Sequence, residues 1–153
     1  MKIISKALPV LMGFKTRSFR RAEESKMIET IEYKKIPATI IHRITGDIDV
    51  EEVKHNITKA NDAIIKIIDK YGSFNLIIDM RGINFKDLAS HKMWKIWSQS
   101  ELITEKANHI AIVLTYSPHT KAEKELMETE TVQFFFDLND SINWLQNSVT
   151  IRK

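Results

Sequence analysis

The chain has 153 residues, of which 43% are hydrophobic and 28% are charged, and it contains no cysteine. This length and composition predict one domain that buries its own core, and they exclude disulfides, thiolate catalysis and cysteine-based zinc sites. The lack of cysteine fits a reducing compartment, so we expect a cytoplasmic protein. No apolar run in the sequence reaches the ~18–20 residues that a membrane-spanning helix needs.

The basic character of the sequence is confined to its start. Residues 1–26 contain seven Lys or Arg and two Glu and so carry +5, whereas the whole chain carries +3, which leaves −2 for residues 27–153. A nucleic-acid-binding domain is expected to carry a basic surplus on its folded part. The sequence therefore predicts no nucleic-acid partner.

Residues 1–26 form a basic extension ahead of the domain that we expect over residues 27–147. Pro9 interrupts the apolar helical face of this segment. Three interpretations are open. The segment is a loosely packed extension in front of an alternative start at Met27, an ordered arm that covers an edge strand or a neighbouring subunit, or a weak basic anchor on an anionic membrane surface.

Two strands come first in the domain. Apolar and polar residues alternate from Ile28 to Lys35, which indicates a half-exposed strand, and residues 38–44 form a second strand that Thr45 and Gly46 are expected to end. The short link between them predicts an antiparallel hairpin at one edge of the sheet. An exposed edge strand can pair with another chain, so a homodimer joined through residues 28–35 is compatible with this pattern.

The clearest helix runs from Asp49 to Tyr71. Its apolar residues recur at three- and four-residue steps, as expected of a helix with one face on a sheet. Asp49 and Glu52 have the spacing of a capping box, and Gly72 is placed to end the helix in the left-handed conformation. The apolar run from Leu76 to Met80 then predicts a central strand that is buried on both faces.

Three charged residues near the end of this central strand are the first candidates for a site. Ligands bind outside the carboxyl ends of the strands in open α/β sheets, and Asp79, Arg81 and Asp87 occupy that region. Structural roles are the alternative for the two aspartates. Asp79 would then accept hydrogen bonds from the loop amides around Arg81, and Asp87 would cap the next helix.

A second helix is predicted from Leu88 to Ile103. Trp94 and Trp97 share one face of it and would either line an apolar pocket or belong to the ordinary core. His91 and Lys95 lie beside Trp94 on the helix and would border such a pocket.

The second half of the chain continues the alternation of strands and helices. His109 to Tyr116 is an apolar strand, Ser117-Pro118 begins a short exposed helix, Thr131 to Phe136 is the last strand, and Asp137 caps a final helix, with a polar tail over residues 148–153. The resulting order is β-β-α-β-α-β-α-β-α. This alternation implies right-handed crossovers, so we expect an α/β fold with a mainly parallel central sheet and an antiparallel edge hairpin.

This order, with DMRGINFKD after the third strand and FFFDLNDSINWLQ at the end, resembles the SpoIIAA-like family within the STAS-type fold. The closing signature of the family is similar to a strand that ends in Phe-Asp, followed by an acidic helix start and then Trp-Leu. The matching residues here are Phe136, Asp137, Asp140, Ile142, Trp144 and Leu145. The resemblance covers about residues 28–147.

The resemblance implies binding and regulation. Anti-sigma-factor antagonists of this fold bind a partner kinase and are phosphorylated at the start of the second helix, within a pattern that resembles Asp-Ser-Ser/Thr-Gly. Asp87 matches this pattern, but Ala89 occupies the phospho-acceptor position and Ser90 occupies the glycine position. Ser90 could act as the phospho-acceptor only if the alignment with the pattern shifted by one residue. A phosphoserine switch places about two negative charges at a helix start, and we expect that switch to be absent. The resemblance also extends to small stand-alone domains whose fold is similar to that of lipid-binding CRAL-TRIO domains. An apolar pocket near Trp94 would suit lipid binding of this kind.

The sequence has no Gly-rich phosphate loop, no GxSxG and no HExxH, so we expect no enzyme activity, no cofactor and no metal site. The first hypothesis is a non-enzymatic regulatory module that binds an unknown protein partner through the second helix and the loop before it. The alternative is a small apolar-ligand or lipid-binding protein with a pocket near that helix. The residues expected to contact the ligand or partner are Asp79, Arg81, Asp87, Ser90, His91, Trp94, Lys95 and Trp97.

Overall fold

A computed structural model describes residues 27–34 and 38–151 of the chain. Its strands are β1 (Ile28–Lys34), β2 (Thr39–Ile48), β3 (Phe74–Asp79), β4 (Ile83–Phe85), β5 (Ala107–Val113) and β6 (Val132–Phe135). Its helices are α1 (Val50–Tyr71), α2 (Leu88–Ser98), α3 (Glu101–Lys106), α4 (Pro118–Met127) and α5 (Leu138–Ile151). The predictions for residues 1–26 and for Lys35 lie outside the described residues.

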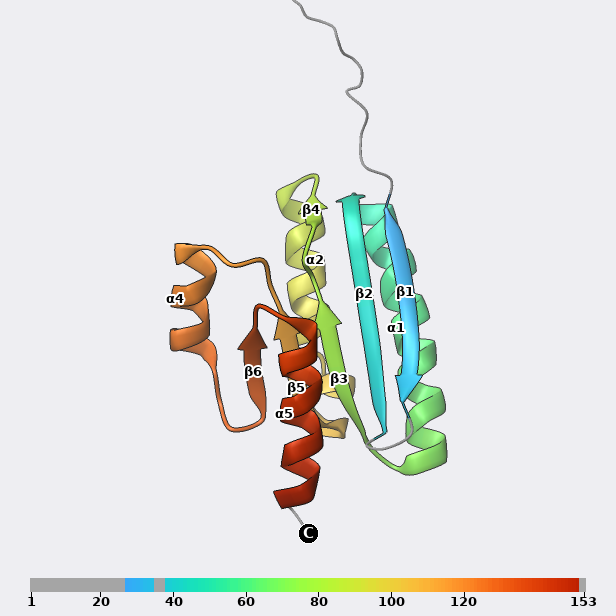
Figure 1. The fold of residues 1–153 in the computed structure, drawn as a ribbon. Coiled ribbons are helices and arrows are strands. Elements are labelled where there is room, and N and C mark those ends of the chain that lie inside the picture. The colour runs from blue at the N-terminus through green and yellow to red at the C-terminus, as the bar shows by residue number, and fades with distance from the viewer. Residues whose placement is uncertain (1–26, 35–37, 152–153) are drawn as a thin grey trace, which may run out of the picture.

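The described strands form one sheet with the order β1-β2-β3-β5-β6, and the short β4 pairs with the end of β2. β1 is antiparallel to β2, whereas every other pair is parallel. The prediction of a mainly parallel central sheet with an antiparallel pair at its edge is therefore confirmed (Figure 1).

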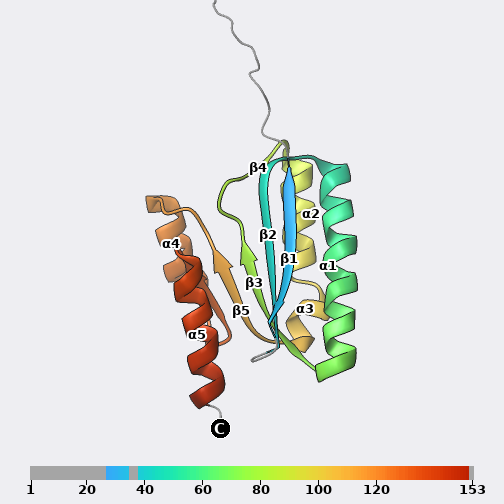
Figure 2. The ribbon, with the colours of Figure 1, turned by 45° about the vertical axis from the view of Figure 1, so that its right-hand side comes forward.

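Side chains alternate along the strands, which gives the sheet two apolar faces. Ile78, Ile112 and Phe134 lie side by side in register on the face that α1, α2 and α3 cover. Ile77 and Ala111, which also pair with each other, pack on the opposite face with α5. Figure 2 shows the sheet between α1, α2 and α3 on one side and α5 on the other. Because both faces of β3 are covered, all six of its residues are buried, and four of them are apolar.

The ends of α1 are fixed as the sequence predicts. The Asp49 carboxylate accepts a hydrogen bond of 2.9 Å from the backbone N–H of Glu52, whose own carboxylate accepts one of 2.8 Å from the N–H of Asp49. At the other end, Gly72 has a φ of +87° and donates its N–H to the carbonyl of Ile68. These bonds satisfy backbone groups that have no partner inside a helix.

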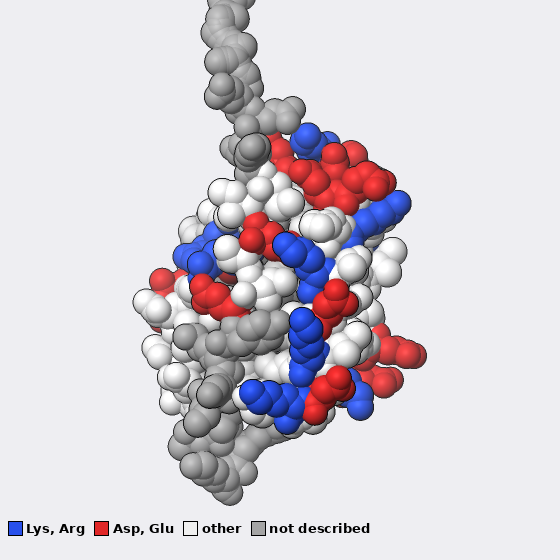
Figure 3. Space-filling view, turned by 90° about the vertical axis from the view of Figure 1, so that its right-hand side faces the viewer, with Lys and Arg blue, Asp and Glu red and all other residues white. Residues whose placement is uncertain are grey.

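The solvent-facing side of α1 carries charges of both signs. Its exposed side chains include Lys54, Lys59 and Lys66 as well as Glu51 and Asp62. Figure 3 shows acidic and basic side chains intermingled over this face, and the part of it that the structure describes carries no continuous basic surface. A nucleic-acid-binding face concentrates basic charge, and this one does not.

The bounds predicted for the second helix are wrong. Residues 88–103 form two helices, because α2 ends at Ser98 and α3 begins at Glu101. Ser100 has the extended backbone of a helix N-cap, so the chain changes direction there. The new direction places Ile103 in the core beneath the sheet.

The second strand is longer than predicted. Gly46 was expected to end it, but β2 continues to Ile48. Gly46 adopts a φ of +95°, which glycine tolerates because it has no Cβ, and its N–H donates to the carbonyl of Gly82. Residues 46–48 then pair with β4, a strand of three residues that the sequence analysis missed.

Two boundaries in the second half also differ from the prediction. β5 runs from Ala107 to Val113, so it begins before His109 and ends before Tyr116. Helix α5 continues to Ile151, past residue 147, where the predicted domain ends. Its start is as predicted, since Asp137 accepts a hydrogen bond of 3.2 Å from the backbone N–H of Asp140.

Candidate functional site

Asp79 and Arg81, the first predicted site residues, bind each other at the end of β3. The guanidinium of Arg81 donates two hydrogen bonds of 2.9 Å to the two carboxylate oxygens of Asp79. The backbone N–H of Arg81 donates a third, of 3.2 Å, to Oδ1. Asp79 therefore accepts a hydrogen bond from a backbone amide of the following loop, as the structural alternative for this residue predicted.

A second arginine also approaches the buried Asp79 carboxylate. Arg43 is its register neighbour on β2, with Nε 3.3 Å from Oδ2. Burial by itself raises the pKa of Asp79, but the hydrogen bonds from Arg81 and the charges of Arg81 and Arg43 outweigh it, so the pKa lies below its ordinary value. Both carboxylate oxygens of Asp79 are thus occupied by residues of the chain itself.

The order of the described parallel strands does not reverse anywhere in the sheet. Ligands of open α/β sheets bind where the strand order reverses, because neighbouring helices then lie on opposite faces. The described parallel strands follow one direction, from β2 to β3, β5 and β6. Asp79 lies on the face of the sheet that α5 covers. The pKa of Arg81 is raised, mainly by its hydrogen bond with Asp79 and to a smaller extent by the charge of Asp137 at the start of α5.

Asp87 and Ser90 form the cap of α2. The Asp87 carboxylate accepts a hydrogen bond of 2.8 Å from the backbone N–H of Ser90, and the hydroxyl of Ser90 donates one of 2.8 Å to the carbonyl of Asp87. The capping role that was the alternative for Asp87 is confirmed. Ser90 is fully buried, so a kinase reaches its hydroxyl only after the first turn of α2 opens.

The two tryptophans of α2 are core residues. Trp94 and Trp97 pack against each other with ring centroids 4.9 Å apart, and both contact the buried ring of His42. The indole N–H of Trp97 donates to the side-chain oxygen of Asn61 on α1. Replacement of Trp94, which is 3% exposed, therefore disturbs the core and is not a neutral test of binding.

His42 has a partner that the sequence analysis missed. Its Nε2 lies 2.6 Å from a carboxylate oxygen of Glu29 on β1, and both side chains are buried. Lys59 of α1 approaches the other carboxylate oxygen of Glu29 at 3.6 Å. The sequence places His42 within a strand, but only the register of the hairpin brings Glu29 close to it.

One edge of Trp94 nevertheless reaches a pocket of about 220 Å³ between α2 and α4. Its floor is formed by β3, β5 and β6, and its two walls are the helices. The residues that line it are Ile78, Met80, His91, Trp94, Lys95, Ser98, Gln99, Ile112, Leu114, Glu123, Met127 and Phe134. Of the predicted site residues, the pocket brings together His91, Trp94 and Lys95, whereas Asp79 lies on the opposite face of the sheet.

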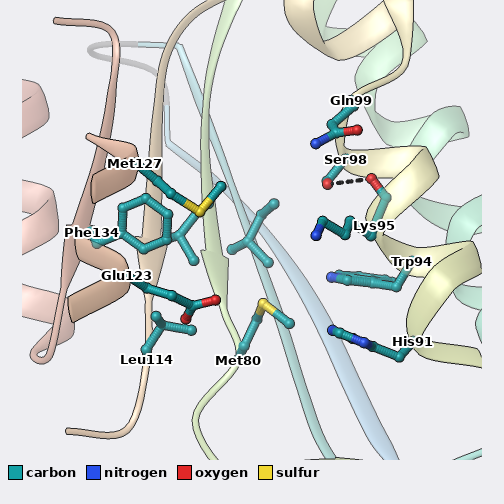
Figure 4. Close-up of a pocket in the computed structure, with 12 residues that line it drawn as sticks. Met80, His91, Trp94, Lys95, Ser98, Gln99, Leu114, Glu123, Met127 and Phe134 are labelled. Atoms are coloured by element: carbon teal, nitrogen blue, oxygen red, sulfur yellow. Dashed lines mark hydrogen bonds between the residues drawn. The ribbon is translucent and has the colours of Figure 1, made fainter. Parts of the chain in front are cut away.

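Helix α4 supplies the wall of the pocket that faces α2 (Figure 4). The ammonium of Lys124 donates to the carbonyl of Phe134 at 2.8 Å, and the carboxylate of Glu128 accepts from the N–H of Phe134 at 3.0 Å. Lys124 and Glu128 are also joined directly, at 2.6 Å. These bonds attach α4 to the outer edge of β6 and place Glu123 and Met127 at the pocket.

The α4 wall was missed because its sequence is short and charged. The described α4 has no buried residue, so no apolar stripe marks it as part of a pocket. A usable signal was the pair Lys124 and Glu128, which are four residues apart and precede a strand of the sheet edge. The start of the helix was predicted, since Ser117 and Thr120 form a capping box around Pro118.

The described residues hold neither a membrane-spanning helix nor a metal centre. No helix in this part of the chain is both long and apolar enough to span a membrane. No group of three His, Cys, Asp or Glu side chains in the same part is arranged to hold a metal ion.

No protein-family model matches the sequence, and no curated protein matches it. The structure is similar to the crystal structure of an uncharacterised protein of the DUF3478 family from Shewanella loihica PV-4, which has a SpoIIAA-like fold. The TM-score is 0.54 at 13% sequence identity, over 87% of this chain and 99% of that chain. The protein thus has the SpoIIAA-like α/β fold that the sequence resemblance predicted. A likeness at this level of identity concerns the fold and assigns no activity.

Proposed function

We propose that the protein is a non-enzymatic regulatory module that binds a protein partner through the exposed face of α2. The observation that carries this proposal is a pair of exposed apolar side chains on that face. Leu88 is 65% exposed and Ile96 is 71% exposed, with Lys92 midway between them. Residues four apart on a helix are neighbours on its surface, so Leu88, Lys92 and Ile96 form one continuous stripe, which we call the α2 stripe.

The charge of α2 indicates the chemistry of the partner. The helix contains Lys92 and Lys95 and has no Asp or Glu between Leu88 and Ser98. A partner surface with apolar side chains and neighbouring carboxylates is complementary to it, since such charges favour encounter and orientation. The burial of Ser90 and the presence of Ala89 support binding without a phosphoserine switch.

A change of one apolar residue in the α2 stripe tests this proposal. Ile96→Asp places a charge in the proposed interface, and Ile65→Asp places one on α1, where the native side chain is 48% exposed. We expect affinity capture from the native cells to give a partner that the wild type and Ile65→Asp retain and Ile96→Asp loses. Equal capture by all three proteins contradicts binding through α2.

A second candidate function is binding of a small apolar ligand in the pocket between α2 and α4. The apolar floor of Ile78, Ile112 and Phe134 favours it. The volume of about 220 Å³ lies below the ~300–1,000 Å³ of pockets for drug-sized ligands, so it favours a small molecule over a lipid chain. A neutral probe such as 3-methylbutan-1-ol should shift the NMR signal of the Trp94 indole N–H, and no shift at millimolar probe counts against this candidate.

A further inference from the structure

The pocket between α2 and α4 presents one positive and one negative side chain from opposite walls. Lys95 comes from α2 and Glu123 from α4, and both point toward the space between the helices (Figure 4). Within the described residues, neither the ammonium of Lys95 nor the carboxylate of Glu123 forms an ion pair. Each charge is therefore available to a molecule in the pocket.

The surface between these two charges is apolar. Met80 and Leu114 lie at one end of the pocket, and Phe134 and Met127 lie on the α4 side (Figure 4). Opposite charges attract each other more strongly where neighbouring apolar groups lower the effective dielectric constant. A ligand that pairs with both the exposed Lys95 and the half-buried Glu123 makes two such contacts, whereas a singly charged ligand makes one.

The size of the pocket limits the ligand further. At about 220 Å³, the pocket is smaller than the ~300–1,000 Å³ pockets that hold drug-sized ligands. This is the scale of a single amino acid and not of a nucleotide or a lipid.

We propose that the pocket binds a free amino acid, or a zwitterion of the same size, that has an apolar side chain. The ligand carboxylate binds Lys95, the ligand ammonium binds Glu123, and the side chain packs on Trp94 and the apolar floor. This proposal rests on the second candidate function, since it assigns a chemical class to the ligand of that pocket.

Four probes that share a 3-methylbutyl group test the proposal. L-Leucine carries both charges, 4-methylpentanoate carries only the carboxylate, 3-methylbutylamine carries only the ammonium, and 3-methylbutan-1-ol carries neither. The readout is the NMR signal of the Trp94 indole N–H in the full chain. The signal of Trp144, which packs on the other side of the sheet with α5, is the internal control. We expect leucine to bind at least about tenfold more tightly than each of the other probes, because hydrogen bonds to charged groups are the stronger ones.

Variants of the two charged residues separate recognition of the charges from general affinity. Lys95→Met and Glu123→Gln should each weaken leucine binding about tenfold or more. The double change Lys95→Glu with Glu123→Lys keeps one charge of each sign and should restore binding to within about threefold of the wild type, with the ligand reversed. Lys66→Met and Glu105→Gln, at exposed positions outside the pocket, are the matched controls.

The outcomes distinguish this proposal from the candidate function on which it rests. If the alcohol or either singly charged probe binds as tightly as leucine, the zwitterion proposal is wrong, while a small-ligand pocket stands. If none of the four probes shifts the Trp94 signal, the proposal and the candidate function both fail. Unchanged leucine binding in Lys95→Met and Glu123→Gln also overturns the proposal.

Discussion

Arg81 holds the buried Asp79 carboxylate through two parallel hydrogen bonds, each 2.9 Å long, at the end of the central strand β3. The fork of a guanidinium matches the two oxygens of a carboxylate, so this geometry is favourable. The pair fixes the turn after β3, and this turn leads the chain into β4 and then to α2.

Loss of Arg81 should destabilise the fold. Arg81→Met leaves the Asp79 carboxylate buried with only Arg43 beside it. We expect a loss of about 1–3 kcal/mol in the free energy of unfolding, less than the ~3–5 kcal/mol of a fully buried pair, because Arg81 is 38% exposed. Chemical denaturation measures this loss. The double variant Arg81→Met with Asp79→Asn should recover part of it, and no recovery would mean that the charge of Asp79 is not the cause.

Stability should fall in acid through the same carboxylate. The pKa of Asp79 is lowered in the folded protein, so the unfolded chain binds a proton at higher pH than the folded chain does. The stabilisation from Asp79 is complete above its ordinary pKa of about 3.9 and is lost as the pH falls through the lower folded value. Asp79→Asn should flatten the dependence of the unfolding free energy on pH in this range, relative to the wild type. An unchanged slope would argue against the pair as its source.

The cap of α2 should contribute measurably to stability. Asp87→Ala removes the acceptor of the Ser90 backbone N–H, and the expected cost is about 1 kcal/mol. Asp62→Ala, at an exposed position within α1, is the matched control and should change stability by less than about 0.5 kcal/mol. Thermal unfolding of the three proteins compares them. Equal midpoints for Asp87→Ala and the control would show that the capping contact carries little free energy.

The attachment of α4 to β6 should protect the edge of the sheet. An uncovered edge strand presents backbone groups that pair with other chains. Glu128→Ala removes the acceptor for the N–H of Phe134 and one partner of Lys124. We expect a loss of about 1–2 kcal/mol and more self-association, which analytical ultracentrifugation detects. Glu125→Ala, on the exposed side of α4, should leave both properties unchanged.

The sequence predicts those parts of the fold that local patterns determine. The apolar spacing of α1 and the capping residues that flank it, Asp49 and Gly72, are local features of the sequence, so the sequence specifies the bounds of this helix. The continuous apolar run of β3 identifies the central strand in the same way. The resemblance added the SpoIIAA-like fold class, and the similar solved structure bears it out.

The parts that were missed depend on contacts between distant segments. β4 has three residues and exists because Gly46 allows β2 to continue beside it. His91, Trp94 and Lys95 were predicted near a pocket, but Glu123 on the facing wall belongs to a helix without buried residues. Asp79 was assigned to the same site because the sequence does not show which face of the sheet the helices α2 and α5 cover.

The measurement that tests the proposed function most directly is photo-crosslinking from a defined position in native cells. A photoreactive amino acid replaces Ile96 in the α2 stripe, and in a second protein it replaces Ile65, an exposed apolar residue of α1 on the same face of the sheet. We predict that one defined protein crosslinks to position 96 and not to position 65. No crosslink at position 96, or the same crosslinked proteins at both positions, would contradict the claim that α2 is the binding surface.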